Sequence, residues 1–312
     1  MGQQTGPAGQ KPAHGVQKQR IRSLLADAEP RRRFTLGASL CFVIALAGCA
    51  AIFMGGGRSY LIAMLVAGFI AAALWPLCNR MWRYIAIGVL APAMGEGWGQ
   101  KEFASGWSAD GLGRIVDGLL SAGGPRTTAW RSAGVYRDIS YRLREETVRR
   151  KRTGDSIREV HHVLVAEISM PHSFSGTVEL VPKSGVVGSR INDVLRMVEG
   201  SKERRQSVDP QFDAVFETLV SGNAPLDELL VPNVQSTLLN LAARHKEGRF
   251  VARFENGWFT LRLPIRRLTF ASAHLLKPLP ELENEAEELW WDLTLPHRLI
   301  DAFSGDYNGP LR

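Results

Sequence analysis

The chain has 312 residues and a formal net charge of +7, but its basic excess is confined to the first 83 residues. That part holds ten Lys and Arg against two Asp and Glu, which leaves 28 basic and 29 acidic side chains for the rest. Because nucleic-acid binding needs a concentrated basic surface on the folded domain, this balance excludes nucleic acid as an expected partner. All three cysteines precede residue 79, so no disulfide framework or cysteine metal site is expected in the main domain.

Residues 1–33 form the basic start of the chain. Residues 1–20 are rich in Gly, Gln, Pro and Lys and show no apolar period, which is typical of disorder. A short helix over residues 21–28 would have to end before Pro30. We expect residues 1–33 to be a disordered tail.

Two apolar runs follow, residues 34–54 and 60–78, and neither holds a charged side chain. As helices, they would each be roughly 30 Å long, which matches the hydrocarbon core of a bilayer. Inside lipid every backbone N–H and C=O must be paired internally, and a helix does this. The runs therefore predict a transmembrane helical hairpin closed by the glycine-rich turn at residues 55–59.

The flanking charges set the expected orientation. Lys and Arg lie at both outer ends of the hairpin and favour the cytoplasm, while the connector offers only Arg58. We therefore expect a multi-pass protein of the bacterial inner membrane, with both termini and the large domain in the cytoplasm. The side chains expected at the two membrane interfaces are Arg31, Arg32, Arg33, Arg58, Trp75, Arg80, Trp82 and Arg83.

A rival interpretation makes the first run an export signal. Residues 31–33 are similar to a twin-arginine pattern, and residues 46–49 are similar to the lipobox of a lipoprotein acylated at Cys49. The leader would be long, however, and the mature chain would open on a second membrane-length helix. Small residues are also common in membrane helices and need no processing to explain them. An exported lipoprotein is therefore the weaker alternative.

Residues 79–134 are interpreted as a stalk and connector. Trp82, Ile85 and Val89 recur at helical spacing, so the second helix is expected to continue beyond residue 78. A further short helix is expected at residues 112–120, between glycine-rich loops.

Residues 135–305 carry the patterns of a folded domain. The Asn256-Gly257 pair separates two alternating runs, which is typical of a hairpin with a type I′ turn. The expected strands lie at residues 135–143, 160–168, 177–181, 212–219 and 250–265, and the expected helices at residues 189–200, 232–248 and 281–293. This order predicts an α+β fold, a mixed and mainly antiparallel sheet with packed helices, followed by a tail at residues 306–312.

Short motifs in this domain are shared with a known family. They are Phe174-Ser175-Gly176, Asp209-Pro210-Gln211-Phe212 with Phe216 after it, and Leu230-Val231-Pro232 at the start of a helix. From roughly residue 34 to residue 303, the chain resembles the bacterial membrane proteins grouped as domain of unknown function 3137. The resemblance implies a two-helix membrane segment followed by a cytoplasmic α+β domain, and it brings no established activity. Val231 departs from the family pattern, in which threonine is usual.

Candidate catalytic and metal-binding groups are few. His161 and His162 are adjacent on an expected strand and point to opposite faces, so they cannot bind one metal ion together. Ser108 lies in a stretch that misses the nucleophile-elbow spacing by one residue. The sequence has neither a P-loop nor a dinucleotide fingerprint. We expect no cofactor, no metal and no catalytic residue, with a membrane-tethered hydrolase as an alternative.

Two groups in the main domain favour an interaction role. They are a basic hairpin tip at residues 149–152 and Trp291, which lies off the apolar stripe of its helix. The expected function is that of a membrane-anchored protein whose cytoplasmic domain is an interaction or scaffolding module. Its expected partners are the lipid bilayer and either another protein or a second copy of the chain. The candidate interaction residues are Arg149, Arg150, Lys151, Arg152 and Trp291.

Overall fold

The computed structural model describes residues 14–53, 60–96, 98–105, 126–151, 158–183, 203–205, 209–244 and 250–307. These residues fall into two compact units. The first, the helical unit, comprises Met1–Met94 and Ser272–Glu288, and the second, the sheet unit, comprises Gly95–Ala271 and Leu289–Arg312. Each unit is therefore built from two segments that are distant in the sequence.

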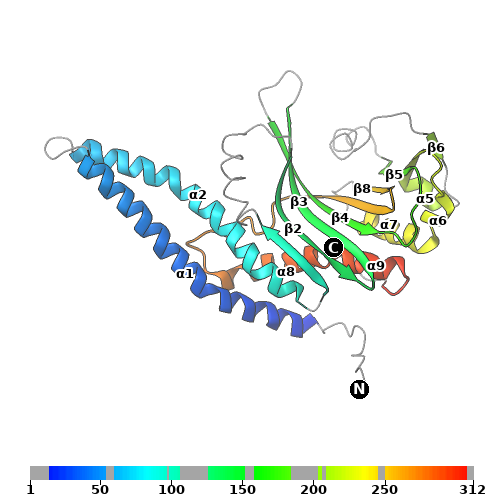
Figure 1. Cartoon of the computed structure of the whole chain (residues 1–312), viewed down its shortest axis with the longest axis horizontal. Helices are drawn as coiled ribbons and strands as arrows, with labels where there is room; N and C mark the ends of the chain where they lie inside the picture. Colours follow the sequence, from blue (N-terminus) through cyan, green and yellow to red (C-terminus); the bar gives the residue numbers. More distant parts are fainter. Residues whose placement is uncertain are drawn as a thin grey trace. The chain divides into compact units, whose positions relative to one another are not determined.

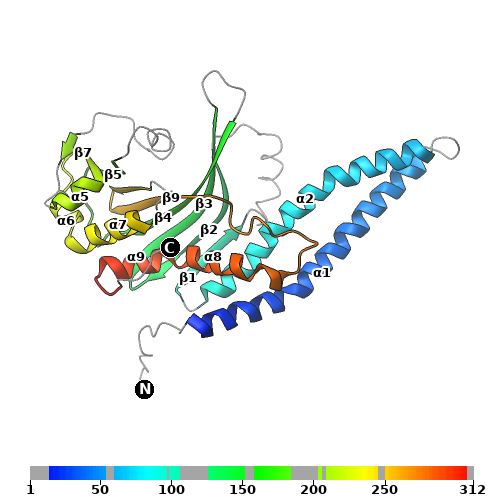
Figure 2. The same ribbon diagram turned by 180° about the vertical axis from the view of Figure 1, so that it is seen from behind.

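Two long helices dominate the helical unit. They are α1 (His14–Phe53) and α2 (Tyr60–Gly95), which lie side by side as a hairpin (Figures 1 and 2). The second segment of the unit, residues 272–288, contains a loop, the 3₁₀ helix η2 (Leu279–Leu282) and the first turns of α8 (Glu283–Leu293). We call residues 272–288 the strap, because α1 packs against η2 within it.

The start of α1 differs from the expectation of a disordered tail. Residues 14–33 are helical, and Ile21, Leu25 and Ala28 are buried at the i, i+4 and i+7 positions of one helix face. The packing of this face outweighs the weak helical signal of the sequence. The helix also continues through Pro30, a residue that removes one backbone hydrogen bond but can be carried inside a packed helix. Residues 1–13 lie outside the described residues.

The second helix continues to Gly95, as its spacing predicts. Along the hairpin the burial of apolar side chains changes. We call the end of the hairpin opposite its turn, which holds the start of α1 and the end of α2, its base. Near the base Trp82 and Leu90 are buried, whereas Phe34, Ile52 and Phe69 are 79%, 83% and 77% exposed. The helical hairpin is confirmed over the described residues. Within those same residues, we find no helix long and apolar enough to cross a membrane.

The described part of the sheet unit contains one nine-stranded antiparallel sheet (Figure 1). Its strands pair in the order β1-β2-β3-β4-β9-β8-β5-β7-β6. The strands are β1 (Gln100–Ser105), β2 (Arg126–Tyr136), β3 (Ile139–Lys151), β4 (Arg158–Ser169), β5 (Thr177–Pro182), β6 (Glu203–Arg205), β7 (Phe216–Ser221), β8 (Val251–Glu255) and β9 (Trp258–Ile265). The expected α+β class and the mainly antiparallel pairing are confirmed.

The Asn256-Gly257 turn is confirmed, and a second turn corrects one expected strand. Asn256 and Gly257 have positive φ angles of 50° and 74°, as a type I′ turn requires. Arg137 and Asp138 also have positive φ angles, 49° and 64°, so the chain reverses between β2 and β3. The strand expected at residues 135–143 is therefore two strands, because the apolar alternation continues across the reversal.

The strand expected at residues 212–219 is half helix. Helix α5 (Pro210–Val215) precedes β7, and Asp209 caps it by accepting a hydrogen bond of 2.8 Å from the backbone N–H of Gln211. Pro210 is the first helical residue, a position that favours proline. The cap and the proline together start a helix that the apolar pattern alone did not indicate.

The remaining helices of the sheet unit are α6 (Leu226–Leu229), α7 (Pro232–Arg244) and α9 (Leu295–Phe303). Helices α7 and α9 lie on one face of the sheet (Figure 2), where α9 packs against β3 and β4. The expected helices at residues 232–248 and 281–293 correspond to α7 and α8, while α9 was not predicted. The expected helices at residues 112–120 and 189–200 lie outside the described residues.

Candidate functional site at the base of the hairpin

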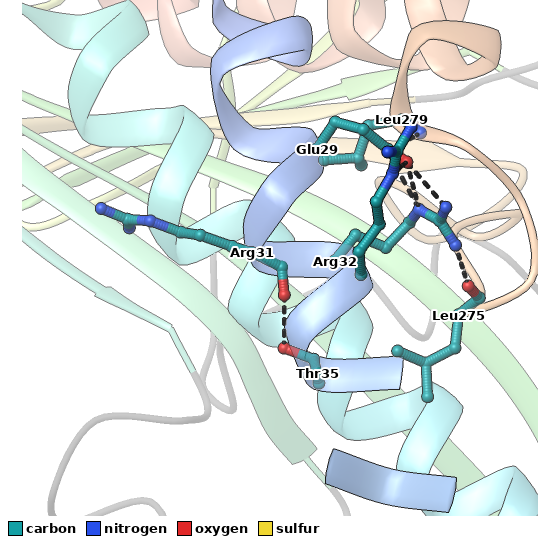
Figure 3. Close-up of polar contacts among 7 residues, drawn as sticks. Glu29, Arg31, Arg32, Thr35, Leu275 and Leu279 are labelled. Atoms are coloured by element: carbon teal, nitrogen blue, oxygen red, sulfur yellow. Dashed lines mark hydrogen bonds and ion pairs between the residues drawn. The ribbon is translucent and has the colours of Figure 1, made fainter. Parts of the chain in front are cut away.

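A buried ion pair connects α1 to the strap. The guanidinium of Arg32 donates to the carboxylate of Glu29 through Nε, at 2.9 and 3.1 Å, and through Nη2, at 2.7 Å (Figure 3). The same carboxylate accepts a hydrogen bond of 3.0 Å from the backbone N–H of Leu279, and Arg32 Nη1 donates to the carbonyl of Leu275. Glu29 and Arg32 are only 8% and 7% exposed. Two charges are therefore held inside the unit with their hydrogen bonds satisfied by the strap.

Helix α2 also forms a hydrogen bond with the strap, at Leu275. The backbone N–H of Leu275 donates to Oδ1 of Asn79 on α2 over 3.0 Å, while its carbonyl accepts from Arg32 on α1. One peptide segment is thus bonded to both helices of the hairpin. We call Glu29, Arg32, Asn79, Leu275 and Leu279 the clasp.

The clasp keeps its charges at physiological pH. Hydrogen bonds from Arg32, together with the backbone N–H of Leu279, lower the pKa of Glu29 from 4.5 to about 2 against the opposing effect of burial. The hydrogen bond to Glu29 in turn raises the pKa of Arg32. The two side chains therefore behave as a permanent ion pair.

Ion pairs with solvent-exposed basic side chains also connect α1 to the strap, nearer the start of α1 than the clasp. Arg22 Nε and Lys18 Nζ lie 2.9 and 3.5 Å from the carboxylate of Glu283, at the start of α8. Such solvent-exposed pairs contribute little to stability. Glu283 is the first residue of α8, and an acidic side chain at that position matches the preference of a helix N-terminus for negative charge.

Four of the expected interface residues are wholly or partly exposed. Arg31, Arg33 and Arg80 are exposed, and Trp75 is half-buried. Figure 3 shows Arg31 pointing away from the clasp, with its carbonyl accepting a hydrogen bond from Thr35. Arg33 also reaches Glu29 through Nε over 3.2 Å, although its side chain is 75% exposed.

Three other residues expected at the membrane interface are buried in the helical unit. Arg32 belongs to the clasp, Trp82 is 1% exposed, and Arg83 is 7% exposed with its guanidinium over the ring of Tyr84. The pattern of tryptophan and arginine at the end of an apolar run is the same for a membrane interface and for a helix end packed on its own protein. Arg58 lies outside the described residues.

The expected interaction residues of the sheet unit lie apart from one another. Arg149 is half-buried on β3, and Arg150 and Lys151 continue that strand. Arg152 lies outside the described residues. Trp291 is half-buried, and the guanidinium of Arg298 lies 4.3 Å from its ring centroid. The structure thus pairs Trp291 with a neighbouring cation on the next helix.

A second polar cluster in the sheet unit surrounds His297. This residue is 2% exposed, and its Nε2 lies 2.8 Å from the carbonyl of Trp98. The rings of Trp98, Tyr136 and Tyr141 have centroids 5.3, 4.7 and 4.8 Å from the imidazole. Burial lowers the pKa of His297 from 6.5 to about 4, and the nearby charge of Arg298 acts in the same direction. His297 is therefore a neutral core histidine that donates to a backbone carbonyl.

A third cluster consists of charges on β3, β4 and β9. Arg144 bonds Glu146 and Glu167 at 2.7 Å each, and Arg262 Nη2 lies 3.6 Å from Glu146. Arg262 is only 2% exposed. Two positive and two negative side chains balance one another, which is typical of a structural ion-pair network.

The groups considered for catalysis or metal binding are not brought together. His161 and His162 pair with Val148 and Thr147 across the sheet, so they occupy opposite faces of β4 as expected. In the described ranges, no group of three or more His, Cys, Asp or Glu side chains is placed to hold a metal ion. Ser108 lies outside those ranges. Cys49, the residue of the lipoprotein alternative, is exposed on α1.

The clasp was missed by sequence reasoning. Glu29, Arg32 and Arg33 stand at the i, i+3 and i+4 spacing that allows ion pairs along a helix, and this was the only local signal. The partners of the pair, Leu275 and Leu279, are about 250 residues away in the chain. No pattern within α1 indicates them.

Replacement of Glu29 by Gln should loosen the strap. The change leaves the buried Arg32 without its counter-charge, and we expect it to cost about 3 kcal/mol of local stability. Hydrogen–deuterium exchange of the Leu275 and Leu279 amides measures this directly, and both should exchange faster. Glu283→Gln, which removes a half-buried acid from the same strap outside the clasp, is the matched control and should leave these amides unchanged. Equal protection in Glu29→Gln and the unmodified protein would contradict the account.

The stability that Glu29 contributes to the strap depends on pH in a defined direction. Since the pKa of Glu29 is about 2 in the folded chain against 4.5 ordinarily, the stabilisation is complete above pH 4.5 and is lost as the pH falls through 2. The difference in exchange between the unmodified protein and Glu29→Gln should therefore be constant above pH 4.5 and shrink below it.

His297 should make the sheet unit sensitive to mild acid. Because its pKa is about 4 in the folded chain and 6.5 ordinarily, unfolding takes up a proton between these values, so stability falls as the pH drops below 6.5. At pH 5 the loss should be about 2 kcal/mol relative to pH 7.5, measured by urea unfolding. His297→Gln should remove most of this difference, whereas His172→Gln, at an exposed loop position, should not. An unchanged pH dependence in His297→Gln would show that another group carries it.

Comparisons with known proteins bear on the sheet unit and the strap. Comparison with curated proteins finds no match. Among solved structures, the chain is similar to the crystal structure of the mycobacterial trehalose monomycolate transport factor A, with 12% identity, 68% of this chain and 95% of that chain covered, and a TM-score of 0.31. Residues 162–304 match the family model described as "Protein of unknown function (DUF3137)", and all the quoted motifs lie in this range. The matched range begins within β4 and includes the strap.

Proposed function

We propose that the chain is a membrane-anchored protein in which the part of the hairpin beyond the clasp inserts into a bilayer. The observation that carries the proposal is the change in burial at the clasp. On its base side each helix buries large apolar residues, such as Leu25 on α1 and Trp82 on α2. On the other side Phe34, Ile52 and Phe69 are more than three-quarters exposed. Such a surface is unfavourable in water and favourable in lipid.

The length and charge of the exposed part support this. From Arg33 to Phe53 and from Tyr60 to Asn79, each helix segment rises by roughly 30 Å, the thickness of a hydrocarbon core. The sequence has no Asp or Glu between Glu29 and Glu96. Among the described residues no helix qualifies as a membrane span, and insertion is proposed from the exposed apolar side chains and from the sequence of the two runs.

We further propose the orientation that the flanking charges favour. Arg31, Arg33 and Arg80 lie at the base of both helices, and positive side chains at the ends of a membrane segment favour the cytoplasm. Both termini and the DUF3137 domain would then lie on the cytoplasmic side of the bacterial inner membrane. The domain would act there by binding another protein or a second copy of the chain.

Open helix surfaces support self-association as one form of this role. Counting only the described residues, nothing lies within 4 Å of a Cβ placed at Gly48 or Gly68, so both positions are open on that part of the hairpin. In membranes such small residues allow the backbones of two helices to approach closely. A second hairpin is the partner that fits these surfaces.

Anchoring is tested by fractionation of cells that express the full chain with a C-terminal reporter. The protein should remain in the membrane pellet after washing with carbonate at alkaline pH, because apolar insertion is not broken by charge or pH. A reporter that is active only in the cytoplasm should be active. Extraction by carbonate would contradict insertion, and activity of a periplasmic reporter would contradict the orientation.

Self-association is tested by cross-linking in membranes. Gly48→Leu with Gly68→Leu should abolish most of a dimer band, since the larger side chains hold the helices apart. Val66→Leu, at an exposed position of the same hairpin, is the control and should keep the band. A dimer that survives both glycine substitutions would rule out this contact.

A further inference from the structure

The clasp fixes which arginines at the base of α1 face outward. Successive residues of an α-helix are rotated by about 100°, so the burial of Arg32 turns its two neighbours to opposite flanks of the same helix turn. Arg31 and Arg33 are both exposed, and Figure 3 shows the guanidinium of Arg31 on the side away from the strap. The burial of one arginine therefore sets the exposure of the other two.

The same level of α2 also presents an arginine. Asn79 bonds the backbone N–H of Leu275, while Arg32 bonds the carbonyl of that residue, so Asn79 and Arg32 stand at one height of the hairpin. Arg80 follows Asn79 directly and is exposed. Three exposed guanidinium groups thus lie at the height of the clasp.

An exposed leucine of the strap accompanies them. Leu275 is fully buried, but the next residue, Leu276, is 63% exposed. Its backbone is held next to both helices by the bonds of Leu275. The strap therefore presents one apolar side chain where the hairpin presents its cations.

The charges near this level leave the cations in excess. Glu29 is the last acid of α1 and is taken up by Arg32, with a further contact to Arg33. The strap contributes Glu281, whose charge acts on Arg32. No acid follows in the sequence of either helix until Glu96.

We propose that Arg31, Arg33, Arg80 and Leu276 form a rim that binds the headgroups of anionic phospholipids. The inference rests on the proposed insertion of the hairpin, which places the clasp at the boundary between lipid and water. There the guanidinium groups meet lipid phosphates, with which arginine forms paired hydrogen bonds, and Leu276 enters the layer of the first acyl carbons. The strap lies within the residues that match the DUF3137 model, so the rim would also bind that part of the chain to anionic lipids.

The test uses the full chain in bilayer nanodiscs of phosphatidylcholine, with spin-labelled phosphatidylglycerol or phosphatidylcholine as the probe. Electron paramagnetic resonance then gives the ratio of the two lipids bound at the protein surface. We expect a preference for phosphatidylglycerol of about fivefold for each arginine engaged. The preference should fall in about 1 M salt, where the screening length is near 3 Å.

Two sets of substitutions separate the rim from general charge. Arg31→Gln with Arg33→Gln and Arg80→Gln should bring the ratio close to one. The control removes three exposed arginines of the sheet unit, Arg131, Arg204 and Arg205, and should keep the full preference. Leu276→Asp should also lower the ratio, whereas Val231→Asp, at an exposed apolar position of the sheet unit, should not.

The outcomes distinguish this proposal from the one on which it rests. Unchanged exchange of the Leu275 amide shows that the variants keep their fold. A protein that enters the nanodiscs but shows no lipid preference, or keeps its preference without the three arginines, overturns the rim and leaves insertion standing. A protein that fails to enter the nanodiscs at all overturns insertion and the rim together.

Discussion

The helical unit depends on the backbone of Leu275, whose two polar groups are bonded to the two long helices. Its N–H is bonded to α2 through Asn79, and its carbonyl is bonded to α1 through Arg32, whose charge is balanced by Glu29. A buried ion pair of this kind often adds little net stability, because apolar side chains of the same volume would do as well. Its effect here is one of position: it fixes the register of two long helices against one short strap.

That register gives the hairpin two different halves. Below the clasp, apolar residues such as Ile21 and Leu90 are buried within the unit, and the helices are part of a protein core. Above it, side chains such as Phe42 and Leu65 are exposed, and the sequence carries no acid on either helix. The strap lies within the residues that match the family model, so the matched range and the hairpin are joined by buried contacts as well as by the chain.

Local patterns predicted much of the fold. The turn at Asn256 and Gly257, the strand β4 and the helix α7 each follow from a few neighbouring residues, and all three are found. The reversal at Arg137 was missed because the apolar alternation on both sides of it stays in phase. The clasp could not be predicted, because Glu29 and its partner Leu279 are 250 residues apart and only the folded chain brings them together.

The central claim is that the hairpin beyond the clasp lies in lipid, and the native cysteines test it most directly. Cys41 and Cys49 are exposed on α1, so in water both should react readily with a charged, membrane-impermeant maleimide. In intact membranes the account predicts no labelling of either cysteine, and rapid labelling once detergent and denaturant are added. Labelling of Cys41 and Cys49 in intact membranes at the rate of an unfolded control would contradict it.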